Sequence, residues 1–193
     1  MGKGSAGRFV SRGGEKLDAA LRAFEISPAG WVCADLGCNT GGFTDCLLSR
    51  GARRVYAVDT GYGALAWTLR RDHRVVVMER CNALHTRLAE PVELVVVDVG
   101  WTRQHLILRA ALELLTSSGV VVSLVKPHYE AERSILRGGV LADGEVAATL
   151  DTVARRMAQA GIRFAAMVPS PIRGHKGNCE FFGLLRPQPA PAQ

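Results

Sequence analysis

The stretch from residue 31 to residue 45, WVCADLGCNTGGFTD, decides the fold. Its first part, residues 31–36, is a short apolar run of the kind that forms a buried parallel strand. A glycine-rich turn follows, and residues 44–50 then read as a helix that Gly51 stops. A strand, a glycine turn and a helix in this order form the first unit of an open α/β sheet. Such a sheet binds its ligand at this turn.

The chain on both sides of this stretch continues the alternation of helix and strand. A leading helix is predicted at residues 13–24, because Leu17, Ala20, Leu21 and Phe24 fall on one helical face. Further strands are predicted at residues 54–59, 75–79, 94–99 and 119–125, and further helices at residues 63–71, 104–116 and 144–160. This spacing predicts a doubly wound parallel sheet with helices on both faces.

Two last strands are predicted at residues 163–168 and 179–185. The ten residues between them are rich in Pro and Gly and leave no room for a helix, so we expect a hairpin and an antiparallel final strand. A seven-stranded, mostly parallel sheet with an antiparallel last strand is similar to the Rossmann-like class I methyltransferases that use S-adenosylmethionine (SAM). We expect a leading segment and helix at residues 1–28, the methyltransferase domain at 29–187, and a disordered tail at 188–193.

Length and composition exclude several classes of protein. A chain of 193 residues suits one domain, and 48% hydrophobic with 22% charged residues excludes a disordered chain. The longest apolar runs, residues 94–97 and 120–125, are far below the ~18 residues that cross a bilayer. Residues 1–12 are polar and do not resemble a signal peptide. These features predict a cytoplasmic protein that does not enter membranes.

The charge is compatible with a polyanionic partner. The 24 Lys and Arg against 18 Asp and Glu give a net charge of +6, although the excess of Arg over Lys is also what genomic composition bias produces. The five cysteines form no C-x-x-C pair and have no His at zinc-finger spacing, so we expect reduced thiols and no metal. They are Cys33, Cys38, Cys46, Cys81 and Cys179.

The glycine turn favours an uncharged or cationic ligand. The dinucleotide pattern G-x-G-x-x-G fails at Asn39, and no Lys-Ser or Lys-Thr completes a phosphate-binding loop. What remains is an acidic residue, Asp35, followed by Gly37, Gly41 and Gly42. The glycines let the backbone approach a ligand closely, while Asp35 supplies negative potential that suits the amino-acid end of SAM.

The tips of the next two strands extend the predicted cofactor site. Asp59 ends one strand, where a carboxylate can accept both ribose hydroxyls, and Asn82 follows the next strand and can pair with an adenine edge. Taken singly, each residue also fits a tight turn or a helix cap. Three consecutive strand tips in this order favour SAM.

Four charged residues form a second group of candidates. Asp98 and Lys126 end two neighbouring apolar strands and should point into the same crevice. Glu180 lies among apolar residues of the last strand, where a carboxylate needs a partner, and Lys16 lies on the leading helix. The alternative for Asp98 with Lys126 is a structural ion pair. The alternatives for Lys16 and Glu180 are a surface lysine and an acid on an edge strand.

The order Lys16, Asp98, Lys126, Glu180 resembles the K-D-K-E tetrad of FtsJ-like ribose 2′-O-methyltransferases. The motifs at residues 11–17 (SRGGEKL), 40–45 (TGGFTD), 125–127 (VKP) and 176–181 (KGNCEF) are more specifically similar to the TlyA family. That family is known by the name haemolysin and methylates cytidine 2′-hydroxyls in ribosomal RNA. The resemblance covers about residues 8–186 and implies that Gly41, Phe43, Asp59, Asn82 and Asp98 line the cofactor.

The chain departs from that family in two places. Only a few residues precede the first motif, where the family carries an S4-like RNA-binding domain, and Gly100-Trp101 stand where the family tends to have Ser-Phe.

The resemblance implies attack of a ribose 2′-oxygen on the SAM methyl, with Lys126 as base or charge stabiliser and no metal.

RNA, as ribosomal RNA or ribosomal subunits, is the expected partner. Trp101 and Tyr129 are candidates for stacking on a base. Rim arginines are candidates for phosphate contacts, namely Arg12, Arg103, Arg133, Arg137 and Arg173. The alternatives are a SAM methyltransferase with a non-RNA acceptor, a catalytically idle SAM- or RNA-binding module, and a pore-forming haemolysin. For the last of these the sequence offers no membrane-active segment.

Overall fold

The computed structural model describes residues 7–187, so the predicted tail at residues 188–193 lies outside the described residues. The helices are α1 (Arg12–Ala23), α2 (Gly42–Ser49), α3 (Trp67–Arg70), α4 (Gln104–Glu113), α5 (Pro127–Glu130) and α6 (Asp143–Gln159), with two short 3₁₀ turns at Arg133–Ile135 and His175–Gly177. The strands are β1 (Val32–Leu36), β2 (Arg54–Val58), β3 (Val75–Met78), β4 (Val92–Val97), β5 (Leu115–Val125), β6 (Leu136–Arg137), β7 (Val140–Leu141), β8 (Ala166–Pro169) and β9 (Phe181–Leu185).

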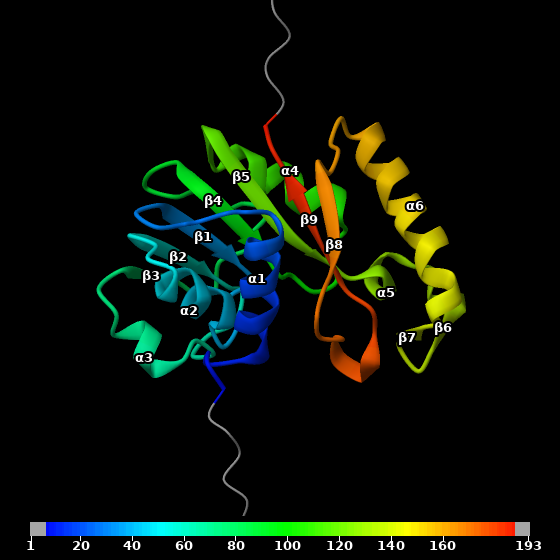
Figure 1. Cartoon of the computed structure of the whole chain (residues 1–193), viewed down its shortest axis with the longest axis horizontal. Coiled ribbons are helices and arrows are strands. Elements are labelled where there is room, and N and C mark those ends of the chain that lie inside the picture. The colour runs from blue at the N-terminus through cyan, green and yellow to red at the C-terminus, as the bar shows by residue number, and fades with distance from the viewer. Residues whose placement is uncertain (1–6, 188–193) are drawn as a thin grey trace, which may run out of the picture.

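Seven strands form one sheet in the order β3-β2-β1-β4-β5-β9-β8 (Figure 1). Strands β1 to β5 pair in parallel, while β9 is antiparallel to both β5 and β8. The predicted mostly parallel sheet with an antiparallel last strand is therefore confirmed. The carboxyl ends of β1, β2 and β4 meet at one edge, where the order of the strands reverses.

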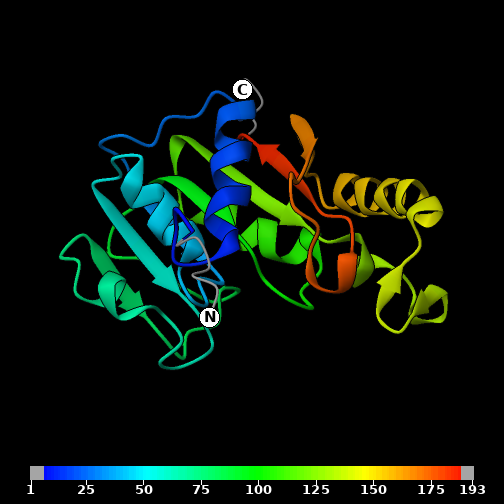
Figure 2. The same ribbon diagram turned by 60° about the horizontal axis from the view of Figure 1, so that its bottom comes forward.

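Helices cover both faces of the sheet, as Figures 1 and 2 show. On one face α1 and α2 pack through Leu17, Leu21 and Leu47 onto the sheet residues Cys33 and Val96. On the other face, α4 and α6 pack onto the alternate residues of the same strands. Because α1 shares its core with β1 and α2, the leading helix is an integral layer of the fold.

The structure departs from the predicted elements in three places. The helix expected at residues 63–71 is shortened to α3, since Gly63 has a φ of +72° and Ala66 a ψ of 139°, and neither value is helical. The helix expected at residues 104–116 ends at Glu113, because Leu115 already pairs with Val92 and extends β5 toward its start. The sequence pattern predicts no element between Lys126 and α6, where the structure forms α5 and the hairpin of β6 with β7.

The remaining strands and helices lie within a few residues of their predicted bounds. Strand β8 is shifted furthest, beginning at Ala166 instead of Arg163. Among residues 7–187, the structure contains no helix with the length and apolar character needed to span a bilayer.

Candidate active site

The glycine turn brings β1 against the end of β4. Gly37 has a φ of +90°, and a Cβ at this position would lie 2.4 Å from the backbone oxygen of Asp98. The Gly37 amide also donates to the Val58 carbonyl at 2.8 Å. Only glycine therefore permits this turn to hold the tips of β1, β2 and β4 together.

The second half of the turn packs against α1. Gly41, with a φ of +101°, precedes the first turn of α2, and a Cβ on Gly42 would lie 2.2 Å from Ser11 Oγ at the start of α1. Phe43 is buried, and its ring lies 6.0 Å from that of Phe182 in β9. The turn thus fixes where α1 begins relative to the sheet edge.

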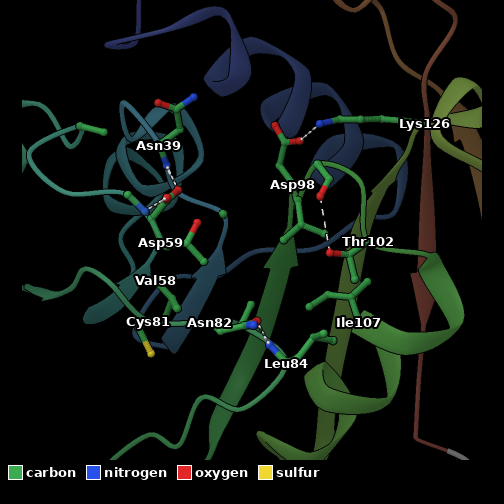
Figure 3. A pocket seen from close by; sticks show the side chains of 17 residues that line it. Asn39, Val58, Asp59, Cys81, Asn82, Leu84, Asp98, Thr102, Ile107 and Lys126 are labelled. Carbon is green, nitrogen blue, oxygen red and sulfur yellow. Dashed lines mark hydrogen bonds and ion pairs between the residues drawn. The ribbon is translucent and has the colours of Figure 1, made fainter.

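Two adjoining cavities open at this edge. The larger, about 550 Å³, is lined by Asp59 and Asn82 at one end and by Asp98 and Lys126 at the other (Figure 3). The smaller, about 230 Å³, is lined by α1 residues including Lys16 and by the glycine turn with Phe43. Gly37, Asn39 and Asp98 line both cavities, so the turn separates two parts of one hollow.

Backbone amides hold Asp59 in place. One carboxylate oxygen accepts from the Asn39 amide at 2.8 Å and the other from the Gly61 amide at 2.7 Å. The side-chain oxygen of Asn82 accepts from the Leu84 amide at 3.0 Å, so the Asn82 NH₂ is the group that can donate into the cavity. Backbone hydrogen bonds thus orient Asp59 and Asn82, the two residues predicted to bind a nucleoside, before any ligand enters.

Asp35 lies beneath the turn and lines neither cavity. Its side chain is fully buried and accepts from the Thr44 hydroxyl at 2.7 Å, while its other oxygen has no hydrogen-bond partner within residues 7–187. Burial, reinforced by the charges of Asp98 and Asp59, raises the pKa of Asp35 to about 7. The structure thus places Asp35 away from the walls of both cavities, since the turn and α2 cover its carboxyl group.

The four predicted tetrad residues form two ion pairs. Lys126 Nζ pairs with Asp98 at the cavity wall, with side-chain exposures of 16% and 28%. Lys16 Nζ lies 2.6 Å from Glu180 Oε2, and this pair is buried. The antiparallel register, which ends with Val125 opposite Phe181, places Glu180 beside Lys126. The tips of β4 and β5, the start of β9 and helix α1 therefore converge as predicted.

Aromatic rings stand beside the Lys126–Asp98 pair. Trp101 is 75% exposed, has a φ of +62°, and its ring lies 4.5 Å from that of Tyr129. Lys126 Nζ lies 5.5 Å from the Tyr129 ring centre. The ring of His128 lies 4.2 Å from that of its neighbour Tyr129. Burial of the His128 imidazole, together with the charge of Lys126, lowers its pKa to about 4.

The predicted rim arginines divide into two groups. Arg103 donates to the Glu130 carbonyl at 2.6 Å, and Arg173 forms a bidentate pair with Asp143 at 2.9 and 3.0 Å. Arg12, Arg133 and Arg137 are exposed and have no ion-pair partner in the part of the chain that the structure describes. Only the second group is available for an anionic ligand.

Several cavity residues were not predicted. They follow the ends of β2, β3 and β4 by two to ten positions and include Thr60, Gly61, Ala64, Ala83, Leu84, Val99, Thr102 and Ile107. Their position after a strand end was the available signal, but none of these side chains carries a charge that would single it out in the sequence. All five cysteines are free, and no group of His, Cys, Asp and Glu within residues 7–187 is arranged to hold a metal ion.

The strand order, the glycine turn and the acidic tips at its carboxyl edge define a Rossmann-like methyltransferase of the SAM-dependent class. The chain belongs to the FtsJ-like methyltransferase family, whose model matches residues 9–186. It is 43% identical over 185 residues to the 16S/23S rRNA (cytidine-2′-O)-methyltransferase TlyA of Mycobacterium tuberculosis, covering 93% of this chain and 69% of the relative.

Solved structures agree with this assignment. A protein of Streptococcus thermophilus described as a hemolysin is 38% identical, with a TM-score of 0.87 over 95% of this chain and 68% of its own. A SAM-dependent methyltransferase of Mesorhizobium loti is 15% identical, with a TM-score of 0.63 over 88% of this chain and 96% of its own, and it shares the fold alone.

Proposed function

We propose that this protein transfers a methyl group from SAM to a ribose 2′-hydroxyl of RNA, with cytidine in ribosomal RNA as the acceptor. The observation that carries the proposal is the pairing of Lys126 with Asp98 at the wall of a cavity whose other end presents Asp59 and Asn82. The relative named for cytidine 2′-O-methylation supports the acceptor class.

The residues present fit SAM. The cavity is large enough for a nucleoside with an amino-acid tail, and the glycine at position 37 keeps the space beside Asp98 free of a side chain. Asp59 would accept from the ribose hydroxyls and Asn82 would donate to the adenine. Gly42 and Phe43 line the smaller cavity, where the amino-acid tail would lie, and Gly41 forms the turn into α2. When bound, SAM supplies an electrophilic methyl group.

Lys126 is the group that acts on the acceptor. Its Nζ would take the proton of the 2′-hydroxyl or stabilise the oxygen as charge develops, and Asp98 would orient the amine toward that oxygen. The Lys16–Glu180 pair holds α1 and β9 beside this group, so we assign both residues positioning roles. The exposed Trp101, supported by Tyr129, would stack on the base of the acceptor nucleotide.

Transfer of labelled methyl from SAM to ribosomal subunits, free ribosomal RNA and transfer RNA tests the proposal. We expect label at a ribose 2′-oxygen, and a decrease of at least ~100-fold in rate for Lys126→Ala with SAM affinity unchanged within a few fold. Arg155→Ala, which changes an exposed cation away from the cavity, is the control and should keep full activity.

Two outcomes contradict this assignment. Joint loss of SAM binding and transfer in Lys126→Ala would show that Lys126 holds the fold or the cofactor instead of acting on the acceptor. Transfer to a protein or small molecule in the absence of RNA, with no label on any RNA, would replace the acceptor class.

A further inference from the structure

Two loops that flank the tetrad are joined into one lobe. They are residues 131–142, which follow α5 and contain the β6–β7 hairpin, and residues 170–179, which precede β9; we name them together the hairpin lobe. Asn178 connects them, since its oxygen accepts from the Leu141 amide at 3.0 Å and its NH₂ donates to the Gly139 carbonyl at 3.1 Å. Lys176 Nζ adds a bond of 2.8 Å to the Gly138 carbonyl.

The second loop of the hairpin lobe lies against the tetrad residue Glu180. Its first loop begins five residues after Lys126, and its second loop ends at the residue before Glu180. A Cβ on Gly174, within the second loop, would lie 2.0 Å from Glu180 Oε1, so this loop closely covers the Lys16–Glu180 pair. Figures 1 and 2 show the β6–β7 hairpin and the turn before β9 projecting beyond the sheet on the same side.

The lobe carries much of the protein's positive charge. Its 22 residues contain four cations, Arg133, Arg137, Arg173 and Lys176, and one acid, Glu132. The resulting net charge of the lobe, +3, is half of the +6 of the whole chain. Asp143 neutralises Arg173, whereas Arg133 and Arg137 are exposed and have no ion-pair partner among residues 7–187. Within the described chain, the lobe's cations without an ion-pair partner are therefore Arg133 and Arg137 on the first loop and Lys176 on the second, and Lys176 is bonded to the Gly138 carbonyl.

The backbone of the lobe is open to a close-fitting ligand. Gly138 has a φ of +60° and Gly177 a φ of +83°, and a Cβ at either position would meet no atom within 4 Å. Small residues beside exposed arginines form a surface that a phosphodiester backbone can approach without displacing side chains. Arg12, exposed at the rim of the smaller cavity, offers a cation on the other side of the tetrad.

From these observations we infer that the hairpin lobe binds the RNA backbone on one side of the acceptor nucleotide, with Arg133 and Arg137 on two phosphates. This inference rests on the proposed function and assigns the RNA to a particular surface. The strand would run from Arg12 across the Lys126–Asp98 pair to the lobe. The lobe would thereby place the acceptor ribose at Lys126 while leaving the base to Trp101.

Binding of a fluorescein-labelled single-stranded RNA, followed by anisotropy over a series of salt concentrations, tests the inference. The double variant Arg133→Ala with Arg137→Ala should bind roughly 20-fold more weakly at about 0.1 M salt, and the slope of log K against log salt should fall by about 1.4. The charge-conserving double Lys variant should keep the slope, and Arg155→Ala with Arg163→Ala should keep both affinity and slope. SAM binding and thermal stability should be unchanged in all variants.

The possible failures are distinguishable. An unchanged slope and affinity in the double Ala variant, with RNA methylated normally, would overturn the lobe assignment and leave the proposed function intact. Equal weakening by the Arg155 and Arg163 control would show diffuse electrostatic attraction and also overturn the assignment. Absence of both RNA binding and RNA methylation in the unmodified protein would overturn the proposed function itself.

Discussion

Asp35 combines full burial with two neighbouring carboxylates and no cationic partner among the described residues. Burial raises the pKa of its carboxyl group from 3.8 to about 7, so the folded protein retains a proton that the unfolded chain releases. Between these two values the folded state binds more protons than the unfolded state. The contribution of Asp35 to stability therefore falls as the pH rises through this window.

Asp35→Asn should gain stability relative to the unmodified protein as the pH is raised from about 5 to about 8, because the amide cannot ionise and still accepts from Thr44. Denaturant unfolding across this range measures the difference. Asp72→Asn is the matched control. The pKa of Asp72 is lowered to about 2 by its hydrogen bonds with Arg74, so this difference should be constant above about pH 5. A constant difference for Asp35→Asn would contradict the assignment.

Gly37 offers a test of the turn geometry. Gly37→Ala should destabilise the protein by more than the roughly 1–3 kcal/mol of a strained backbone, because its Cβ also meets the Asp98 carbonyl, and it should abolish SAM binding. Gly161→Ala is the control, since Gly161 has a φ of +73° in open space. Denaturant unfolding and calorimetric titration with SAM measure both effects. If Gly37→Ala and Gly161→Ala lowered the unfolding free energy equally, backbone strain alone would account for the loss, and contact with the Asp98 carbonyl would contribute nothing.

At the scale of elements, the Lys16–Glu180 pair links α1 with β9 across 164 positions of sequence. Lys16→Met should cost about 3–5 kcal/mol of unfolding free energy, because it leaves the Glu180 carboxylate buried without its cation. Adding Glu180→Gln should recover part of this loss. A double-mutant cycle by denaturant unfolding measures the coupling, and additive losses would show that the two side chains do not depend on each other.

The elements that the sequence predicted well are those whose burial is uniform. The valine runs of β4 and β5 are apolar on both faces, and this is what a central parallel strand requires. Leu115 and Thr116 belong to β5 instead of the predicted helix, because the apolar pattern of α4 continues through Leu114 and Leu115 while pairing of Leu115 with Val92 overrides it. The hairpin of β6 and β7 was missed because each strand has only two residues and no periodicity.

The candidate site was predictable to the extent that topology placed it. Asp59, Asn82, Asp98 and Lys126 follow strand tips, and parallel strands bring their tips to one edge. Asp35 differs because it lies one residue before the tip, where its side chain turns under α2 instead of into the cavity. Whether the Asp35 side chain faces α2 or the cavity depends on which face of β1 the helix α2 covers. The order of charged residues along the sequence does not contain this information.

For the whole molecule, SAM binding should raise thermal stability by mass action. At a free concentration of 100 times Kd, the ligand adds about 2.7 kcal/mol, which corresponds to roughly 5–11 °C in Tm for a chain of this size. Differential scanning calorimetry with increasing SAM measures the shift. Asp59→Ala, which removes the proposed ribose acceptor, should reduce it. An unchanged Tm at saturating SAM would contradict binding to the native cavity.

The antiparallel strand β9 has a consequence for the order of events during synthesis. It is the last strand along the described chain, yet it lies between β5 and β8 and carries Glu180 to the side of Lys126. A nascent chain that has exposed every earlier strand still has a gap in its sheet and lacks one member of the tetrad. We therefore expect the proposed catalytic arrangement to form only after the strand at residues 181–185 has left the exit tunnel and inserted between β5 and β8.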